Sequence, residues 1–229
     1  MIRDKKKVII AGSEGLLGKI LCESLSQEYE IIGLDLKNGN NFTDQNQIRE
    51  ILHFHKDAYG LVNLFALNPQ PNESSSKPED VSLDSIREYL EVNVVSLYSI
   101  CIEFSKICCK NASIVNFSSI HGVLSPKHFI YENGYIKHPG YTISKSAVNG
   151  LSKYLATYFG SKLRVNTVIA GGVKNNQTKN FIKNYSNMTP LKRMMNKSEI
   201  SSSVRYLLSE ESSYVTGSEV TVDGGWTTW

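Results

Sequence analysis

Tyr141 and Lys145 lie four residues apart, downstream of a serine pair, Ser118 and Ser119, that ends an apolar run. Four residues make about one helical turn, so the phenol and the ammonium are expected on the same helix face. A phenol loses its proton near pH ~10, but a fixed cation nearby favours the phenolate and lowers its pKa. At ~4 Å and an effective dielectric constant of ~20 the attraction is roughly 4 kcal/mol before desolvation, enough for a shift of about two units. The pair could therefore act as a general acid and base; the alternative is two unrelated helix neighbours.

The composition is that of an ordinary globular protein: 229 residues, 41% hydrophobic and 21% charged, with a formal net charge of +3. This length suits one α/β domain with a large core, and the small charge gives no argument for nucleic acid. No apolar stretch approaches ~20 residues, and 8–11 is too short for a leader, so neither a membrane span nor a secretory signal is expected. The four cysteines have no zinc-site spacing. They indicate reduced thiols in a cytoplasmic protein, and no metal site is expected.

Short apolar runs alternate with segments of helical periodicity along the chain. The predicted strands are 7–11, 31–34, 60–66, 112–117, 163–169 and 219–222, and the predicted helices are 16–28, 45–56, 83–109, 141–158 and 199–208. This alternation predicts a doubly wound α/β fold, in which helices cover both faces of one parallel sheet. No repeat or linker divides the chain, so residues 1–229 are expected to form a single domain of about six to seven strands.

Three glycines, Gly12, Gly15 and Gly18, follow the first predicted strand and open the first predicted helix. Glycines permit a tight turn and a close approach of backbone to a pyrophosphate, and the helix N-terminus offers unpaired N–H groups. Asp35 ends the second strand about twenty residues further on, where it could accept hydrogen bonds from an adenosine ribose. These features predict a Rossmann-type fold that binds NAD in preference to NADP, because a carboxylate repels a 2′-phosphate. The positive charge of Lys37 is the one feature nearby that would favour the 2′-phosphate of NADP. The alternative role for Asp35 is that of a turn-forming residue.

Further segments resemble the short-chain dehydrogenase/reductase family nearly end to end. The residues that carry the resemblance are Asn93 in Glu-Val-Asn-Val-Val, 113–119, 119–122, 164–173, 190–194 and 214–225. The last segment is long and similar to the family's C-terminal signature. The resemblance implies a single Rossmann-type domain and an NAD(P)-dependent oxidoreductase that interconverts an alcohol and a ketone by hydride transfer.

The same resemblance implies roles for individual residues. Tyr141 would exchange a proton with the substrate oxygen, and Lys145 would lower its pKa and hold the nicotinamide ribose. Ser119 would hydrogen-bond the substrate oxygen, and Asn93 would anchor a water chain that feeds protons through Lys145. The implied cofactor-binding residues are Gly12, Ser13, Gly15, Leu17, Gly18, Asp35, Asn41, Phe42, Asn63, Ala66, Tyr141, Lys145, Gly171 and Val173.

The sequence also departs from the usual family pattern. The glycines are spaced Gly-x-x-Gly-x-x-Gly, as in the larger sugar-nucleotide members. Only five residues separate Asp35 from Asn41, too few for a crossover helix, so the usual third strand should be missing or reduced. Asn63-Leu-Phe-Ala66 stands where the family usually has Asn-Asn-Ala-Gly; Asn63 and Ala66 fit this pattern, and the two residues between them do not. Cofactor binding is expected to survive these changes.

Residues 120–139, here called the substrate loop, form a longer segment than in most short members of the family. They leave a strand end and should form a wall of the substrate pocket. Their polar and basic side chains are Lys127, His128, Tyr131, Tyr135, Lys137 and His138. The set suits a polar, phosphorylated or sugar-like ligand and resembles members from bacterial surface-sugar and flagellin-glycan pathways; a solvated loop or subunit contact is the alternative. Residues 171–187, the closing loop, are expected to be mobile and to close over cofactor and substrate.

The leading hypothesis is an NAD-dependent alcohol dehydrogenase or ketone reductase for a polar or sugar-derived substrate. One alternative is a 3-ketoacyl thioester reductase, which Asp35 disfavours because such enzymes mostly use NADP. The other is a catalytically silent cofactor-sensing protein, which the complete set of catalytic residues disfavours. Family members usually assemble through the two long helices, here 83–109 and 141–158, so a homodimer or homotetramer is expected. Neither nucleic acid nor a membrane is an expected partner.

Overall fold

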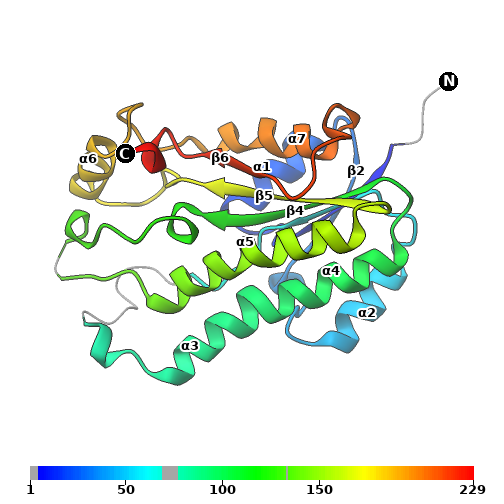
Figure 1. Cartoon of the computed structure of the whole chain (residues 1–229), viewed down its shortest axis with the longest axis horizontal. Helices are drawn as coiled ribbons and strands as arrows, with labels where there is room; N and C mark the ends of the chain where they lie inside the picture. The colour runs from blue at the N-terminus through cyan, green and yellow to red at the C-terminus, as the bar shows by residue number, and fades with distance from the viewer. Residues whose placement is uncertain (1–4, 69–76, 133) are drawn as a thin grey trace.

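The computed structural model describes residues 5–68, 77–132 and 134–229, in which helices cover both faces of one parallel sheet (Figure 1). The strands are β1 (Lys7–Ala11), β2 (Glu30–Leu34), β3 (Gly60–Asn63), β4 (Ala112–Ser119), β5 (Leu163–Ala170) and β6 (Glu219–Val222). Their order across the sheet is β2-β1-β3-β4-β5-β6, and every pairing is parallel. The predicted fold class is confirmed. Most of the predicted 68–80 loop lies outside the described residues.

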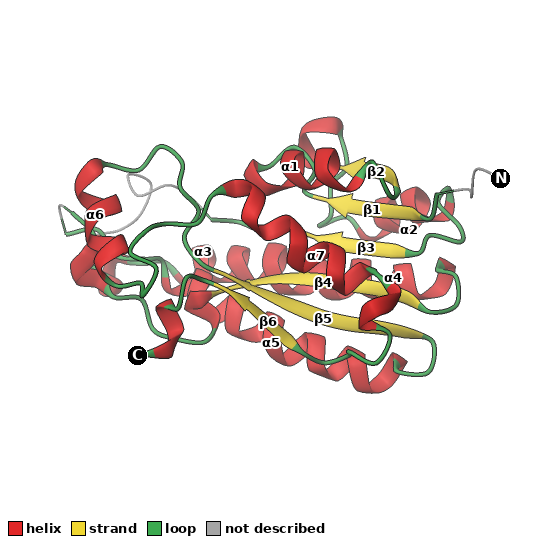
Figure 2. Cartoon of the chain, turned by 90° about the horizontal axis from the view of Figure 1, so that it is seen from above, coloured by secondary structure: helices red, strands yellow, loops and turns green. Residues whose placement is uncertain are grey.

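The helices of the described chain are α1 (Leu16–Leu25), α2 (Gln45–His53), α3 (Leu83–Leu90), α4 (Ser96–Ile107), α5 (Pro139–Phe159), α6 (Lys179–Asn187) and α7 (Ser201–Leu208). Helices α1 and α7 cover one face of the sheet, and α2, α4 and α5 cover the other (Figure 2). Within β1, Val8 and Ile10 pack on the first layer while Ile9 and Ala11 pack on the second. A strand buried on both faces is apolar along most of its length, which is why β1 was recognisable as a continuous apolar run. Strands β4 and β5 also bury polar side chains, among them Ser113, Asn116 and Asn166.

Strand β2 lies at one edge of the sheet. Only a short 3-10 helix, Leu36–Asn38, and a turn occupy the stretch after Asp35, and the described residues add no strand beyond β2. The sheet therefore has six strands, as the short spacing between Asp35 and Asn41 indicated.

The predicted helix 83–109 is present but interrupted. A π-helical turn, Glu91–Val95, separates α3 from α4 and carries the buried Asn93. Turns of this kind often occur at functional sites.

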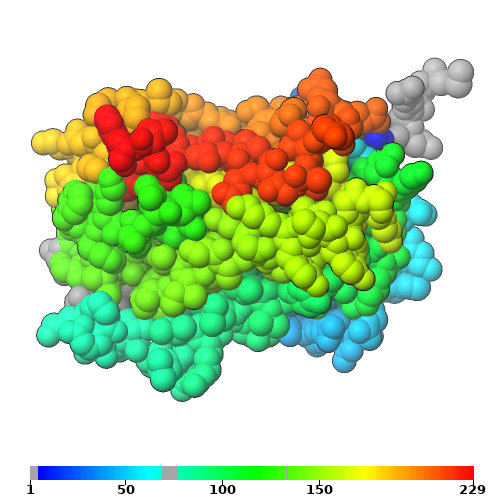
Figure 3. Space-filling view, viewed as in Figure 1, coloured from blue at the N-terminus to red at the C-terminus, as the bar shows by residue number. Residues whose placement is uncertain are grey.

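The closing loop differs from its prediction. Residues 179–187 form α6, whose first turn is capped by the Thr178 hydroxyl, so this part of the predicted mobile loop is a helix. Its mobility stays a prediction. The apolar side of α6 joins a buried cluster formed by Ile120, Ile130, Tyr185, Met194 and Trp226. Substrate loop, closing loop and C-terminal segment thus gather at one end of the molecule, as the green, gold and red surfaces of Figure 3 show.

Candidate active site

A cavity of about 660 Å³ opens at the carboxyl ends of the strands, where the strand order reverses between β1 and β3. Ligands of doubly wound sheets bind at this position. The wall runs from residues 12–18, here called the glycine loop, past the end of β4 to the substrate and closing loops. The predicted site residues that line it are Gly12, Gly15, Leu17, Gly18, Ala66, Ser119, Tyr141, Lys145, Gly171 and Val173.

Tyr141, in the first turn of α5, and Ser119, at the end of β4, meet in this cavity. The phenol and the Ser119 hydroxyl are hydrogen-bonded to each other. Ser119 Oγ also accepts a hydrogen bond from the His121 N–H at 3.2 Å, which holds its position. Two hydroxyls from different elements can therefore contact the same substrate oxygen.

Lys145 is buried one helical turn after Tyr141. Its Nζ donates to the Phe117 carbonyl at 2.8 Å and lies 5.8 Å from the centroid of the Tyr141 ring. Burial, with a smaller contribution from Lys137, lowers the pKa of Lys145 to about 8. The ammonium can consequently exchange protons close to neutral pH.

The expected lowering of the Tyr141 pKa is wrong for this structure. Burial raises the pKa of the phenol, outweighing the opposite effect of the hydrogen bond from Ser119. The physical reason is that Tyr141 is deeply buried, while the Lys145 ammonium is bonded to a backbone carbonyl. Residue spacing showed a shared helix face but not the depth of either group.

Helix α5 is fixed to β4 by contacts that sequence reasoning did not assign. Ser118 Oγ donates to the Lys145 carbonyl at 2.8 Å. A Cβ added at Gly122 would lie 2.5 Å from Ser118 Oγ and 2.7 Å from the Lys145 carbonyl oxygen, so only glycine permits this approach. His138 caps α5, its Nδ1 accepting from the Gly140 N–H at 3.1 Å. The proline that follows His138 was the available signal for this helix start.

Asn93 lies behind the cavity wall, not in it. Its Oδ1 accepts from the Leu67 N–H at 2.6 Å, and its Nδ2 donates to the Leu67 carbonyl at 3.1 Å and to Ser144 Oγ at 2.9 Å. The side chain therefore joins the segment after β3 to α5. Its role in a water chain stays a prediction.

The glycine loop has the shape of a pyrophosphate cradle. Gly12 has φ +92°, and a Cβ there would lie 2.6 Å from the Phe65 nitrogen. Helix α1 starts after Gly15 without a side-chain cap, which leaves its first N–H groups for a ligand. The Ser13 hydroxyl is buried and has no hydrogen-bond partner. An uncapped helix start and an orphaned hydroxyl fit the phosphates of a dinucleotide.

Asp35 connects this cradle to the end of β2. Its carboxylate accepts from the Glu14 N–H at 2.9 Å and from the Lys37 N–H at 3.0 Å. It is therefore both a turn former and a carboxylate beside the glycine loop.

Three other predicted cofactor residues, with Ser13 and Asp35, do not line the cavity. Phe42 is buried against Phe65, with ring centroids 4.6 Å apart, and Asn63 donates to Asn116 Oδ1 at 2.8 Å. The Asn41 side chain accepts from the Thr43 N–H and hydroxyl. Their contacts with a cofactor stay predictions.

His121 is a cavity residue whose importance the sequence did not reveal. Its ring centroid lies 6.4 Å from that of Tyr141, and burial, followed by Lys137 and His128, lowers its pKa to about 4. The unfolded chain therefore binds more protons than the folded one between pH ~6.5 and ~4, so stability falls as pH falls through this window.

We expect His121 to account for a loss of about 2 kcal/mol of unfolding free energy between pH ~7 and ~5. Urea denaturation of wild type and His121→Gln at both pH values measures it, with the exposed His53→Gln as the control. An equal loss in His121→Gln and wild type contradicts this assignment.

Comparison with known proteins supports a dinucleotide-binding oxidoreductase site. A family model described as "Enoyl-(Acyl carrier protein) reductase" matches residues 39–227. The chain is 37% identical over 233 residues to the 3-alpha-(or 20-beta)-hydroxysteroid dehydrogenase of Mycobacterium bovis, covering 98% of this chain and 81% of that protein. It is 29% identical over 252 residues to Post-translational flagellin modification protein A of Campylobacter coli, covering 97% and 98%. The structure of a short-chain dehydrogenase from Leptospira borgpetersenii with bound NAD+ has a TM-score of 0.84 at 28% identity, covering 98% of this chain and 93% of that one.

The chain therefore belongs to the short-chain dehydrogenase/reductase family, as the sequence motifs indicated. It is an oxidoreductase that acts on CH–OH groups with a nicotinamide cofactor. In the part of the chain that the structure describes, no helix combines the length and hydrophobicity needed to cross a bilayer.

Proposed function

We propose that this protein is an NAD-dependent alcohol dehydrogenase or ketone reductase for a polar, sugar-derived substrate, serving bacterial surface-glycan biosynthesis. The observation that carries the proposal is one cavity with Tyr141, Ser119 and Lys145 beside a pyrophosphate-shaped glycine loop. The polar substrate loop supports the substrate class. The relative named for flagellin modification, matched over nearly its whole length, supports the pathway.

Each side chain has a distinct part in this mechanism. When bound, the nicotinamide accepts or donates the hydride. Ser119 donates a hydrogen bond to the substrate oxygen. Tyr141 takes the hydroxyl proton as a phenolate during oxidation and gives a proton back as a phenol during reduction. Lys145, with its pKa lowered to about 8, passes that proton onward and contributes a buried positive charge beside the phenol. Asn93 positions α5 through Ser144.

The proposal is tested by mixing the protein with NAD and a panel of sugars, sugar phosphates and simple alcohols. Reduction of NAD, followed at the nicotinamide absorbance band, is the expected result. NADPH with an acetoacetyl thioester tests the ketoacyl reductase alternative in the same format. Tight NADH binding without turnover in either direction would contradict the enzyme proposal and support a cofactor sensor.

The carboxylate of Asp35 is expected to favour NADH over NADPH. We expect NADH to bind at least about tenfold more tightly than NADPH, because a 2′-phosphate would lie near this carboxylate. Fluorescence titration measures both affinities, and Asp35→Asn should narrow the ratio. Asp44→Asn is the matched control, because Asn also caps a helix and Asp44 caps α2. Tighter binding of NADPH to the wild type would contradict the role given to Asp35.

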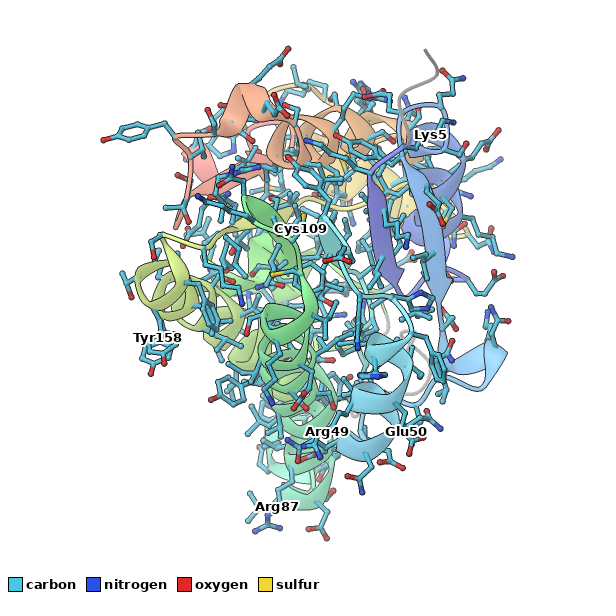
Figure 4. All side chains as sticks on the ribbon, turned by 90° about the vertical axis from the view of Figure 1, so that its right-hand side faces the viewer. Lys5, Arg49, Glu50, Arg87, Cys109 and Tyr158 are labelled. Atoms are coloured by element: carbon cyan, nitrogen blue, oxygen red, sulfur yellow. The ribbon has the colours of Figure 1, made fainter. Side chains whose placement is uncertain are left out.

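We also propose a homodimer or homotetramer that assembles through α4 and α5. Tyr98 of α4 is 47% exposed, and Tyr154 and Tyr158 of α5 are 62% and 72% exposed. Figure 4 shows Tyr158 pointing away from the ribbon, and its ring stacks on that of Tyr154 at 6.5 Å. Aromatic residues exposed together mark protein interfaces.

Changing both Tyr154 and Tyr158 to Glu should reduce the particle mass measured by light scattering. Phe54→Glu, at an exposed position after α2, is the control and should leave the mass unchanged. A wild-type monomer, or a double variant of wild-type mass, contradicts the proposed interface.

The remaining parts of the proposal concern the organisation of the chain. Residues 1–229 act as one dinucleotide-binding domain, with the substrate loop as pocket wall and the closing loop as a movable cover. The cytoplasm is the proposed location, supported by four free cysteines.

A further inference from the structure

The substrate loop places a second lysine in the cavity. Lys137 Nζ lies 4.1 Å from the centroid of the Tyr141 ring, nearer than the Nζ of Lys145 at 5.8 Å. The Lys137 ammonium donates to the side-chain oxygen of Asn68, a neutral group. It is therefore held over the phenol that exchanges the substrate proton, without a counter-charge from that partner.

Among the described residues, no carboxylate forms an ion pair with this ammonium. Within the described residues, neither Lys137 nor Lys145 takes part in an ion pair. Glu132 is the only carboxylate among the described residues that line the cavity. Its oxygens accept from Thr178 Oγ1 at 2.6 Å and Asn180 Nδ2 at 2.7 Å instead. In the part of the chain that the structure describes, the substrate side of the cavity thus carries positive charge without an ion-pair partner.

The positive charge of Lys137 is energetically unfavourable at its half-buried position. Lys137 is half-buried, and burial lowers its pKa to about 8. It also lowers the pKa values of Lys145 and His121 by repulsion. An anion bound between these groups would relieve the desolvation and the repulsion together.

We propose that Lys137 binds an anionic group of the substrate, a carboxylate or a phosphate, within a few bonds of the carbon that is oxidised or reduced. The proximity follows from the geometry, because the same Tyr141 ring lies beneath the ammonium and carries the hydroxyl that meets the reacting oxygen. A lysine ammonium is a compact point charge that accepts either anion. This inference rests on the proposed function and narrows its substrate class to acidic or phosphorylated hydroxy compounds.

The first experiment compares acidic substrates with neutral partners of similar shape. The pairs are lactate with 2-propanol, gluconate with sorbitol, and glucose 6-phosphate with glucose, each assayed with NAD. The wild type should have the higher kcat/KM for an acidic member. In Lys137→Met the acidic-to-neutral ratio should fall at least about tenfold, chiefly through KM, because a charged hydrogen bond is lost. Lys137→Arg should keep part of the ratio.

Lys110→Met is the control for the loss of one positive charge, because Lys110 is exposed and precedes the amino end of β4. It should leave the ratio unchanged. An unchanged ratio in Lys137→Met overturns the inference. An equal fall in kcat for the acidic and the neutral member of a pair in Lys137→Met overturns it too. That result would mean that the Lys137 ammonium acts only on the acidity of Tyr141 and does not bind the substrate.

A second measurement separates this inference from the proposed function. With saturating NADH and constant ionic strength, phosphate or acetate should raise the wild-type melting temperature more than chloride does. The increment should vanish in Lys137→Met and persist in Lys110→Met. Loss of the increment in Lys137→Met supports the anion site even if no panel compound is turned over. The inference is overturned if phosphate and acetate raise the wild-type melting temperature no more than chloride does. It is also overturned if they raise the melting temperature of Lys137→Met as much as that of the wild type.

Discussion

The Tyr141→Phe protein will lose at least about 10²-fold in kcat while still binding NADH. The change removes one oxygen and leaves the ring, which fills its buried position beneath Lys137. Ser119 loses its phenol partner but keeps its bond from the His121 N–H. The expected defect is thus in proton transfer, and steady-state rates together with an NADH titration will separate it from a binding defect.

Tyr59→Phe is the matched control for this experiment. Tyr59 is also buried, and its hydroxyl donates to the Leu208 carbonyl at 2.8 Å, on the far side of the sheet from α5. Its loss should cost about 1 kcal/mol of stability with little change in kcat. Wild-type turnover by Tyr141→Phe would show that another group performs the acid–base step.

Gly18→Ala should abolish tight NADH binding. A Cβ at this position would lie 2.1 Å from the Gly12 carbonyl oxygen and 2.6 Å from the Ser13 carbonyl oxygen. Both are backbone atoms that cannot rotate away, so the glycine loop must move and the phosphate cradle changes shape. We expect NADH affinity to fall at least about tenfold and stability to fall by about 1–3 kcal/mol.

Gly150→Ala is the corresponding control in α5. Apart from the adjacent backbone of α5 itself, no atom of the described residues lies within 4 Å of the added Cβ, so this change should leave NADH binding unaltered and add about 0.5–1 kcal/mol of stability. NADH titration and denaturant unfolding of both variants provide the comparison. Wild-type NADH affinity in Gly18→Ala would place the cofactor phosphates elsewhere.

The sheet was predictable because burial on both faces leaves short apolar runs in its strands, such as residues 8–11 of β1. β4 is buried at every position, and the short stretch after Asp35 had no room for another strand. Helix α6 was missed because its sequence is mostly polar. Its Phe181 and Tyr185 are four residues apart after the Thr178 cap, but they pack on segments far away in the chain.

The candidate site was predictable in its membership more than in its electrostatics. The spacing of Tyr141 and Lys145 correctly indicated one helix face and one cavity. It carried no information on the Phe117 carbonyl that binds the Lys145 ammonium, or on the burial that raises the Tyr141 pKa. Lys137 lies in an irregular loop without periodicity, so its position over the phenol needed three-dimensional coordinates.

The hydrogen bonds from Thr178 and Asn180 to Glu132 have a consequence for how molecules enter and leave. These bonds connect the substrate loop to the start of α6 at the cavity that contains Tyr141 and Ser119. Solvent-exposed polar bonds of this kind contribute little net free energy. We therefore propose that product leaves when the hydrogen bonds to the Glu132 carboxylate break, while the sheet and the helix bearing Tyr141 stay in place for the next turnover.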